Sequence, residues 1–349
     1  MKRFIIIFYS ALAILMAGCS KEVVTKSMVG ADDAWMYDVT LPVPVLFASP
    51  EVQTKAPVTA ISNGMEIGVF GFRTDAEMYS DTDDGMNMRN ANVKVNTKLM
   101  LNLTEPFYYP ESDNFRFYSY HPYSGSYQID DDGKVSVEID FSYNNTLATH
   151  KDVLWAREDG DGGFNADLAR EGVRPKFSYT HPAICVSFYA KVDKVVAKTS
   201  VAKLYFKDVP TSGKLCVADV SNPDAEGRFY EVVSRGDLML TNGRSGSLEV
   251  ELSTEPSKLG QDVFMYPDSE PFCLQVTLRM GEAGKSYDVM TDYVIRPKDL
   301  PDGKFLPGHH YSFCLNVLTG SSDISFTVTK DSEEDILDFD NEFQWEDAF

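Results

Sequence analysis

The sequence has few basic residues, and so acidic a chain excludes several kinds of partner. Thirty-two Lys and Arg against 53 Asp and Glu give a formal net charge of −21. Such a chain repels the phosphates of nucleic acid and the headgroups of anionic lipid, so we expect neither as a direct partner. The 43% apolar and 12% aromatic residues are enough to build packed cores, which excludes a globally disordered chain.

The common motifs of catalysis and metal binding are also missing. No GxSxG elbow, HExxH helix or P-loop accompanies the five histidines, and no CxxC pair has the spacing of a zinc site. The acidic runs at 81–85, 130–133 and 158–163 lack the ligand spacing of an EF-hand calcium loop. Asp and Gly are also the commonest turn residues, so we predict solvated turns there. We therefore expect that the protein is not an enzyme and that it binds neither a cofactor nor a metal.

Long apolar runs are confined to the N-terminus. Lys2 and Arg3 precede an apolar stretch at 4–16, and the sequence LMAGC then ends at Cys19. The stretch has roughly 13 residues, too few for a transmembrane helix, which needs about 20. A positive start, a short apolar run and small residues before a cysteine are typical of a lipoprotein signal peptide. We predict cleavage before Cys19 and lipidation of its thiol; the alternative is an ordinary secretory signal with an incidental cysteine.

Cysteine is scarce in the rest of the chain. Four cysteines lie inside strand-like runs: Cys185, Cys216, Cys273 and Cys314. Two disulfides would be stable in an oxidising cell envelope. Buried free thiols are the simpler interpretation of cysteines within strands.

Strong helical periodicity is nearly absent, and strand patterns take its place. Residues 127–141 form the clearest hairpin, with a turn at Asp130–Gly133 and strict alternation after it. A short helix is expected at 164–171, and the polar residues 74–92 are expected to form a long surface loop. Further strands are expected at 65–72, 114–120, 201–209, 246–252, 272–280, 286–295 and 310–318. Closely spaced strands with Gly, Pro and Asp turns predict an all-β chain built of β-sandwiches.

A group of tyrosines has two interpretations. They are Tyr108, Tyr109, Tyr118, Tyr120, Tyr123 and Tyr127. These rings either line a sugar-binding face or fill a sandwich core with their hydroxyls at its rim. Alternation along the strands favours the core.

Both ends of the mature chain contain strand-like apolar segments. Residues 39–47 (VTLPVPVLF) are apolar, but two prolines confine them to a sheet edge. Near the C-terminus, Leu337, Phe339, Phe343 and Trp345 recur with a period of two, broken by one asparagine. That period describes a strand with one buried face and one wet face. It is either donated to a partner or the last strand of its own fold.

A series of short motifs runs along most of the chain. They are the lipobox at Cys19, Thr54–Ala56, Ile67–Phe72, Tyr108–Pro110, Phe115–Pro122, Asp152–Ala156, Phe177–Ala183 and Gly308–Phe313. In this order they resemble the fimbrillin (Mfa-like) family, the subunits of type V pili. The resemblance implies a structural pilus (fimbria) subunit that functions in adhesion at the surface of the outer membrane. It also implies that other pilus subunits are its partners, joined by strand exchange.

The resemblance implies a domain organisation as well. A signal peptide at 1–18 and a lipid-anchored tether at 19–35 would precede two transthyretin-like β-sandwich domains in tandem. The first domain would cover 36–176 and the second 177–349, with a candidate donor strand at 336–349. The sequence does not identify a host or bacterial surface receptor.

The family also implies a maturation step. A protease removes the lipidated N-terminal piece after a basic residue, here Lys55 before Ala56, and the vacated groove accepts a neighbour's C-terminal strand. Well-known members have Arg at the position of Lys55, and anchor subunits stay lipidated and uncut, so an anchor role is an alternative. Two other classes are a glycan-binding surface lipoprotein, which would need an exposed aromatic platform, and a hydrolase, which would need histidine and carboxylates converging in a pocket.

Overall fold

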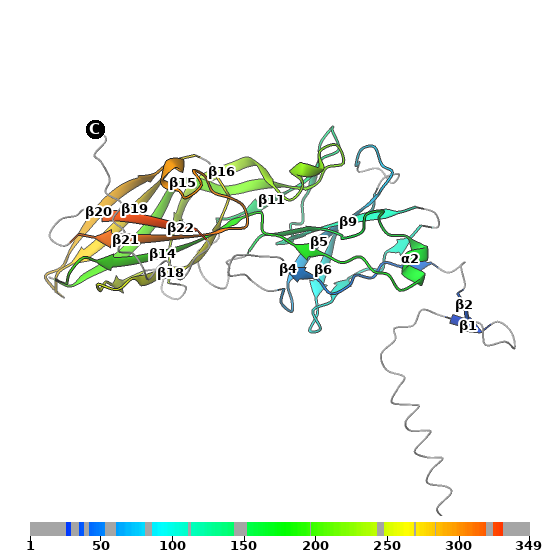
Figure 1. Cartoon of the computed structure of the whole chain (residues 1–349), viewed down its shortest axis with the longest axis horizontal. Helices are drawn as coiled ribbons and strands as arrows, with labels where there is room; N and C mark the ends of the chain where they lie inside the picture. Colours follow the sequence, from blue (N-terminus) through cyan, green and yellow to red (C-terminus); the bar gives the residue numbers. More distant parts are fainter. Residues whose placement is uncertain are drawn as a thin grey trace, which may run out of the picture.

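The computed structural model describes residues 26–28, 35–37, 42–52, 61–80, 86–110, 113–142, 152–195, 197–242, 248–268, 270–282, 284–318 and 324–330. In these residues the chain is almost entirely β, as predicted, and Figure 1 shows an elongated molecule with two halves end to end. The helical elements of the described residues are the α-helix α2 (Ala166–Arg170) and the short 3₁₀ helices η1 (Pro223–Ala225) and η2 (Pro297–Asp299). Within the described ranges, no helix is long and apolar enough to cross a membrane.

The first half is organised around a five-stranded antiparallel sheet in the order β12-β9-β5-β6-β7. Its strands are β5 (Glu66–Arg73), β6 (Met86–Val95), β7 (Leu101–Leu103), β9 (Phe115–His121) and β12 (Leu154–Arg157). One face is covered by helix α2 and by the short strands β3 (Val43–Pro44), β4 (Glu51–Val52), β8 (Tyr108–Tyr109) and β13 (Ser178–Tyr179). A separate pair, β1 (Lys26–Met28) and β2 (Trp35–Tyr37), precedes them.

The opposite face of this sheet packs against β10 (Gln128–Ile129), β11 (Val135–Asp140) and the far end of β15 (Thr199–Ala218). Strand β5 therefore has two buried faces. Six consecutive residues of β5, from Ile67 to Phe72, are buried. The sequence of a strand that is covered on both faces is a continuous apolar run and does not alternate. Residues 67–72 have such a sequence.

The second half is a sandwich of two sheets around one hydrophobic core. One sheet has the order β18-β14-β21-β22, and β14 is parallel to β21. The facing sheet consists of the start of β15 with β19 and β20, and β16 and β17 also pair with β15. Their bounds are β14 (Ile184–Val192), β16 (Phe229–Met239), β17 (Val250–Glu251), β18 (Ser257–Met265), β19 (Phe272–Met280), β20 (Tyr287–Ile295), β21 (His310–Val317) and β22 (Ile324–Lys330).

Strand β15 connects the two halves. It is 20 residues long; its residues 199–207 pair with β19 and its residues 212–218 pair with β11 of the first half. A single sheet thus crosses the boundary predicted at residue 177 (Figure 1). The domain limits at 36–176 and 177–349 stay predictions.

The local predictions have mixed outcomes. The hairpin at 127–141 is confirmed by the pairing of β10 with β11, and the short helix is confirmed as α2. The surface loop predicted at 74–92 is wrong for residues 86–92, which belong to β6. Polar residues obscured the strand pattern there: Asn90 is buried, donates to the Ser124 carbonyl at 2.7 Å and accepts from the Tyr120 hydroxyl at 2.7 Å.

The four cysteines of the described chain are free thiols, in agreement with the simpler interpretation. Cys185, Cys216 and Cys314 are buried, and Cys273 is partly buried. Burial raises the pKa of Cys216 to about 12 and that of Cys314 to about 11. These thiols stay protonated and unreactive at neutral pH.

Candidate functional site

The predicted site residues all lie outside the described residues. Cys19, the Lys55–Ala56 bond and the segment 336–349 with Leu337, Phe339, Phe343 and Trp345 are in this group. The structure does describe residues 42–52, which end just before the predicted cleavage bond. We call these residues the leading segment.

The leading segment is an extended chain with two different faces. Val45 and Phe47 are buried, with 4% and 2% of their surface exposed, whereas Pro44 and Leu46 are exposed. A period of two is the signature of a strand laid against a core. The prediction that proline confines this region to an edge is confirmed, because β3 pairs only with β8 among the described strands.

Backbone hydrogen bonds hold the leading segment on two sides. The Val45 amide donates to the Phe107 carbonyl at 2.8 Å, next to the antiparallel pairing of β3 with β8. Further along, the Ala48 amide donates to Pro175 at 2.9 Å and the Glu51 amide to Phe177 at 3.0 Å. There β4 runs parallel to β13. The segment therefore bridges residues 107–109 and 175–179.

Phe47 is the main apolar contact of the leading segment. Its ring lies edge-on to Phe117 of β9, at 5.4 Å between ring centroids, and 5.2 Å from Phe177. Full burial of a Phe or Val side chain contributes about 1.5–3 kcal/mol, so Phe47 and Val45 supply most of the apolar binding free energy of the segment.

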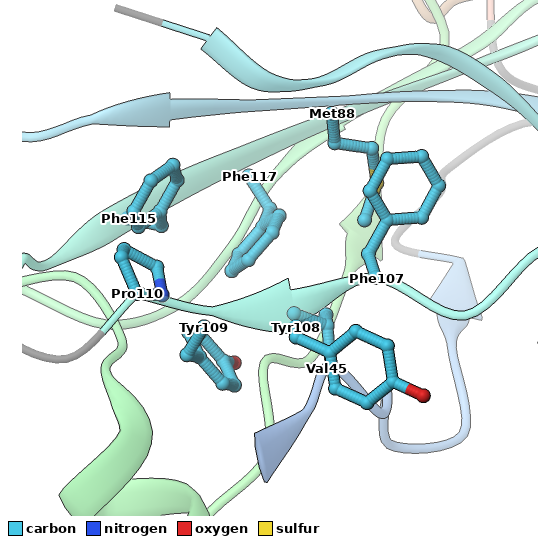
Figure 2. Close-up of a pocket in the computed structure, with 8 residues that line it drawn as sticks. All are labelled: Val45, Met88, Phe107, Tyr108, Tyr109, Pro110, Phe115 and Phe117. Carbon is cyan, nitrogen blue, oxygen red and sulfur yellow. The ribbon is translucent and has the colours of Figure 1, made fainter. Parts of the chain in front are cut away.

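We call the surface beneath the leading segment, around Phe107, Phe117 and Phe177, its bed. Side chains do not fill this surface completely. Figure 2 shows a small apolar hollow lined by Val45, Met88, Phe107, Tyr108, Tyr109, Pro110, Phe115 and Phe117. The buried Tyr109 hydroxyl has no hydrogen-bond partner among the residues that the structure describes, and burial raises the pKa of this phenol. A buried hydroxyl without a partner costs about 1–3 kcal/mol, so packing at this end of the segment is imperfect.

A polar contact holds the far end of the leading segment. The Glu51 carboxylate lies 2.6 Å from Lys176 Nζ and accepts a hydrogen bond from the Ser178 hydroxyl at 3.0 Å. These two contacts lower the pKa of Glu51 below its ordinary value. Because the groups are exposed, the ion pair positions the strand end and adds little stability.

One cluster of Ser, His and Asp has the composition of a hydrolase triad. The Ser187 hydroxyl lies 2.7 Å from His310 Nε2 and also bonds to the Asp262 carboxylate. Burial alone would raise the pKa of Asp262, but hydrogen bonds from Lys258 and Ser187 lower it, so Asp262 is ionised and only accepts. Ser187 therefore donates to Asp262 and accepts from His310. A nucleophilic serine must give its proton to histidine, and this arrangement does not do so.

The tyrosines favour a core over a sugar-binding platform. Tyr109, Tyr118 and Tyr120 are buried, which confirms the core interpretation for these three. Tyr108 is exposed, on the outer side of β8.

Sequence reasoning missed the bed beneath the leading segment. Phe107, Phe117 and Phe177 are far apart in the chain and come together only through the pairings of β8, β9 and β13. The alternation of Val43, Val45 and Phe47 was the available signal.

The model of the fimbrillin-like family matches residues 54–330. No curated protein matches the chain. A candidate cell adhesion protein from Bacteroides uniformis is 15% identical, with a TM-score of 0.50 over 83% of this chain and 99% of that one. Another from Bacteroides ovatus is 14% identical, with a TM-score of 0.53 over 82% and 96%.

A fimbrial protein from Bacteroides vulgatus is 12% identical, with a TM-score of 0.53 over 82% of this chain and 98% of that one. Identities this low show a shared fold and no more. The family match rests on the sequence itself and covers well over half of the chain. The chain therefore belongs to the fimbrillin-like family.

Proposed function

We propose that this chain is a structural subunit of a surface pilus that functions in adhesion, and that subunits assemble by strand exchange at the bed of the leading segment. The observation that carries the proposal is the leading segment itself. It is an edge strand with one buried face, and it ends three residues before the Lys55–Ala56 bond.

Cleavage after Lys55 would leave the leading segment bound by noncovalent contacts alone. Its departure would expose the rings of Phe117 and Phe177 and would free the carbonyls of Phe107, Pro175 and Phe177 from their donors. An exposed groove with unpaired backbone groups binds an added strand strongly, because one strand satisfies both needs.

The C-terminal segment 336–349 is the proposed replacement strand. Its apolar residues Leu337, Phe339, Phe343 and Trp345 recur with the same period of two as Val45 and Phe47. Departure of Val45 would also widen the small hollow beside Phe117, so that a larger side chain of the replacement strand can enter it. Before cleavage the subunit would be held at the outer membrane by lipid on Cys19.

Filament formation in vitro tests the proposal. The mature chain with Cys19→Ser is cut by a lysine-specific protease and followed by electron microscopy. We expect filaments from the cut chain and none from Lys55→Gln, which cannot be cut at this bond. Deletion of residues 336–349 should give a cut, folded chain that forms no filaments.

Filaments that form from the deleted chain would overturn strand exchange through this segment. N-terminal sequencing of surface protein distinguishes the two pilus roles. A mature start at Ala56 supports a polymerising subunit, and a start at Cys19 alone supports an uncut anchor.

A further inference from the structure

Strand β20 lies at one edge of the seven-stranded sheet, and its pairing with β19 is unbroken. All nine residues pair with β19, from Tyr287 opposite Met280 to Ile295 opposite Phe272, without a bulge. Within the described part of the chain, no strand pairs with the other side of β20. Its outer side therefore presents a full-length row of backbone donors and acceptors.

Natural sheet edges are usually protected against pairing by shortness, bulges, charged side chains (lysine above all) or proline. Other edges here follow this rule: β7 has three residues and β10 has two. Strand β18 carries Lys258 and has an irregular register with β14, next to Gly260 at a φ of 63°. The sequence of β20, YDVMTDYVI, contains neither lysine nor proline.

The outward side chains of β20 also favour association. Met290 and Val294 are 65% and 51% exposed, and they lie four residues apart on one face of the strand. Asp292 lies between these two residues and Asp288 lies beside Met290, and side chains of β19 contact both aspartates. Arg279 Nε lies 2.8 Å from the Asp288 carboxylate, and Gln275 donates to Asp292 at 2.9 Å.

The charge pattern of β20 is compatible with a second copy of the same strand in one register. In an antiparallel pair centred on Thr291, Met290 faces Asp292 and Asp288 faces Val294. A shift of two residues in either direction would place aspartate opposite aspartate, which is destabilising. A shift of one residue would turn the apolar side chains to the wrong face. Larger shifts leave fewer residues paired, so the register centred on Thr291 is favoured.

We propose that the edge of β20 is an interaction surface for a second copy of this chain, joined by antiparallel pairing of β20 with β20 about Thr291. This lateral contact is separate from the bed of the leading segment and does not depend on strand exchange. Because the chain is strongly acidic, association should tighten as added salt screens the repulsion between copies.

Sedimentation velocity over a range of concentrations tests the proposal on the uncut mature chain with Cys19→Ser. We expect a reversible dimer whose dissociation constant rises at least tenfold in Met290→Asp, which places a carboxylate opposite Asp292 of the other copy. Val195→Asp is the matched control, because Val195 is equally exposed, at 67%, and lies outside β20. It should dimerise like the parent chain.

Crosslinking tests the register. Thr291→Cys should form an intermolecular disulfide under mild oxidation, because residue 291 faces its own copy, and Asp288→Cys should not. A chain that is monomeric at every concentration, or a dimer unaffected by Met290→Asp, would overturn the proposal. Loss of the dimer on deleting residues 336–349 would also overturn it, by assigning the contact to the C-terminal segment.

Discussion

The two halves of the molecule bury their sheets differently. The central sheet of the first half has a core on each face, and β5 and β9 are buried along nearly their whole lengths. In the second half, β18 and β19 alternate between buried and partly exposed residues around one shared core. A sheet with two cores can lose a strand from one face and keep the other core. The leading segment lies on such a sheet.

The single core of the second half should be the more sensitive to a cavity. Phe188 packs with its ring centroid 5.1 Å from Phe206 and 5.2 Å from Phe313. Phe188→Ala should lower the free energy of unfolding by about 3–5 kcal/mol, measured by urea denaturation. Tyr287→Ala, at an exposed ring of the same half, should change it by less than about 0.5 kcal/mol. Equal effects would show that the second half does not depend on this core.

Truncation of Phe47 should weaken the leading segment and leave the second half unchanged. Phe47→Ala removes a fully buried ring and should lower the free energy of unfolding by about 3 kcal/mol. This is the low end for a buried phenylalanine, because an edge segment can relax around the cavity. Hydrogen exchange should show faster exchange at Val45 and Glu51 and unchanged protection in β19. Leu46→Ala, at the exposed neighbour, is the control. Faster exchange throughout the chain would contradict independent behaviour of the two halves.

The close approach of Gly68 to Tyr120 in the first half allows a test with a smaller expected effect. A Cβ on Gly68 of β5 would lie 2.1 Å from the ring of Tyr120. Gly68→Ala should therefore cost about 1–3 kcal/mol through overpacking. Gly125→Ala has open space around its Cβ and should be neutral in the same denaturation experiment. A neutral Gly68→Ala would mean that the core around Tyr120 yields easily.

The sequence predicted the strands better than the site. Alternation identified the hairpin at 127–141 and strands such as 272–280, because one face of each is wet. It failed at 86–92, where buried Asn90 is satisfied by Tyr120 and Ser124, and a polar residue with buried partners looks like a loop residue. It also could not place Phe47 on Phe117 and Phe177, since those contacts depend on pairings between distant segments.

The two halves should also differ in how stability depends on pH. In the first half, burial raises the pKa of Glu158 to about 8, and the Phe117 amide and Arg116 offset this only in part. In the second half, Lys258 and Ser187 overcome burial and lower the pKa of Asp262. A folded-state pKa above the unfolded value means that the folded chain binds the extra proton.

Stability from Glu158 is therefore greatest below its unfolded pKa, near 4.5, and is lost as pH rises through about 8. The contribution of Asp262 is present above its unfolded pKa and is lost only in acid. Between pH 6 and 8 the free energy of unfolding should fall by about 1 kcal/mol per pH unit. Glu158→Gln should flatten this slope in urea denaturation, except for a part retained by Glu226, whose pKa burial also raises. Asp262→Asn should leave the slope in this range intact. A slope that persists unchanged in Glu158→Gln would show that Glu158 is ionised in the folded chain, with Arg116 as its effective counter-ion.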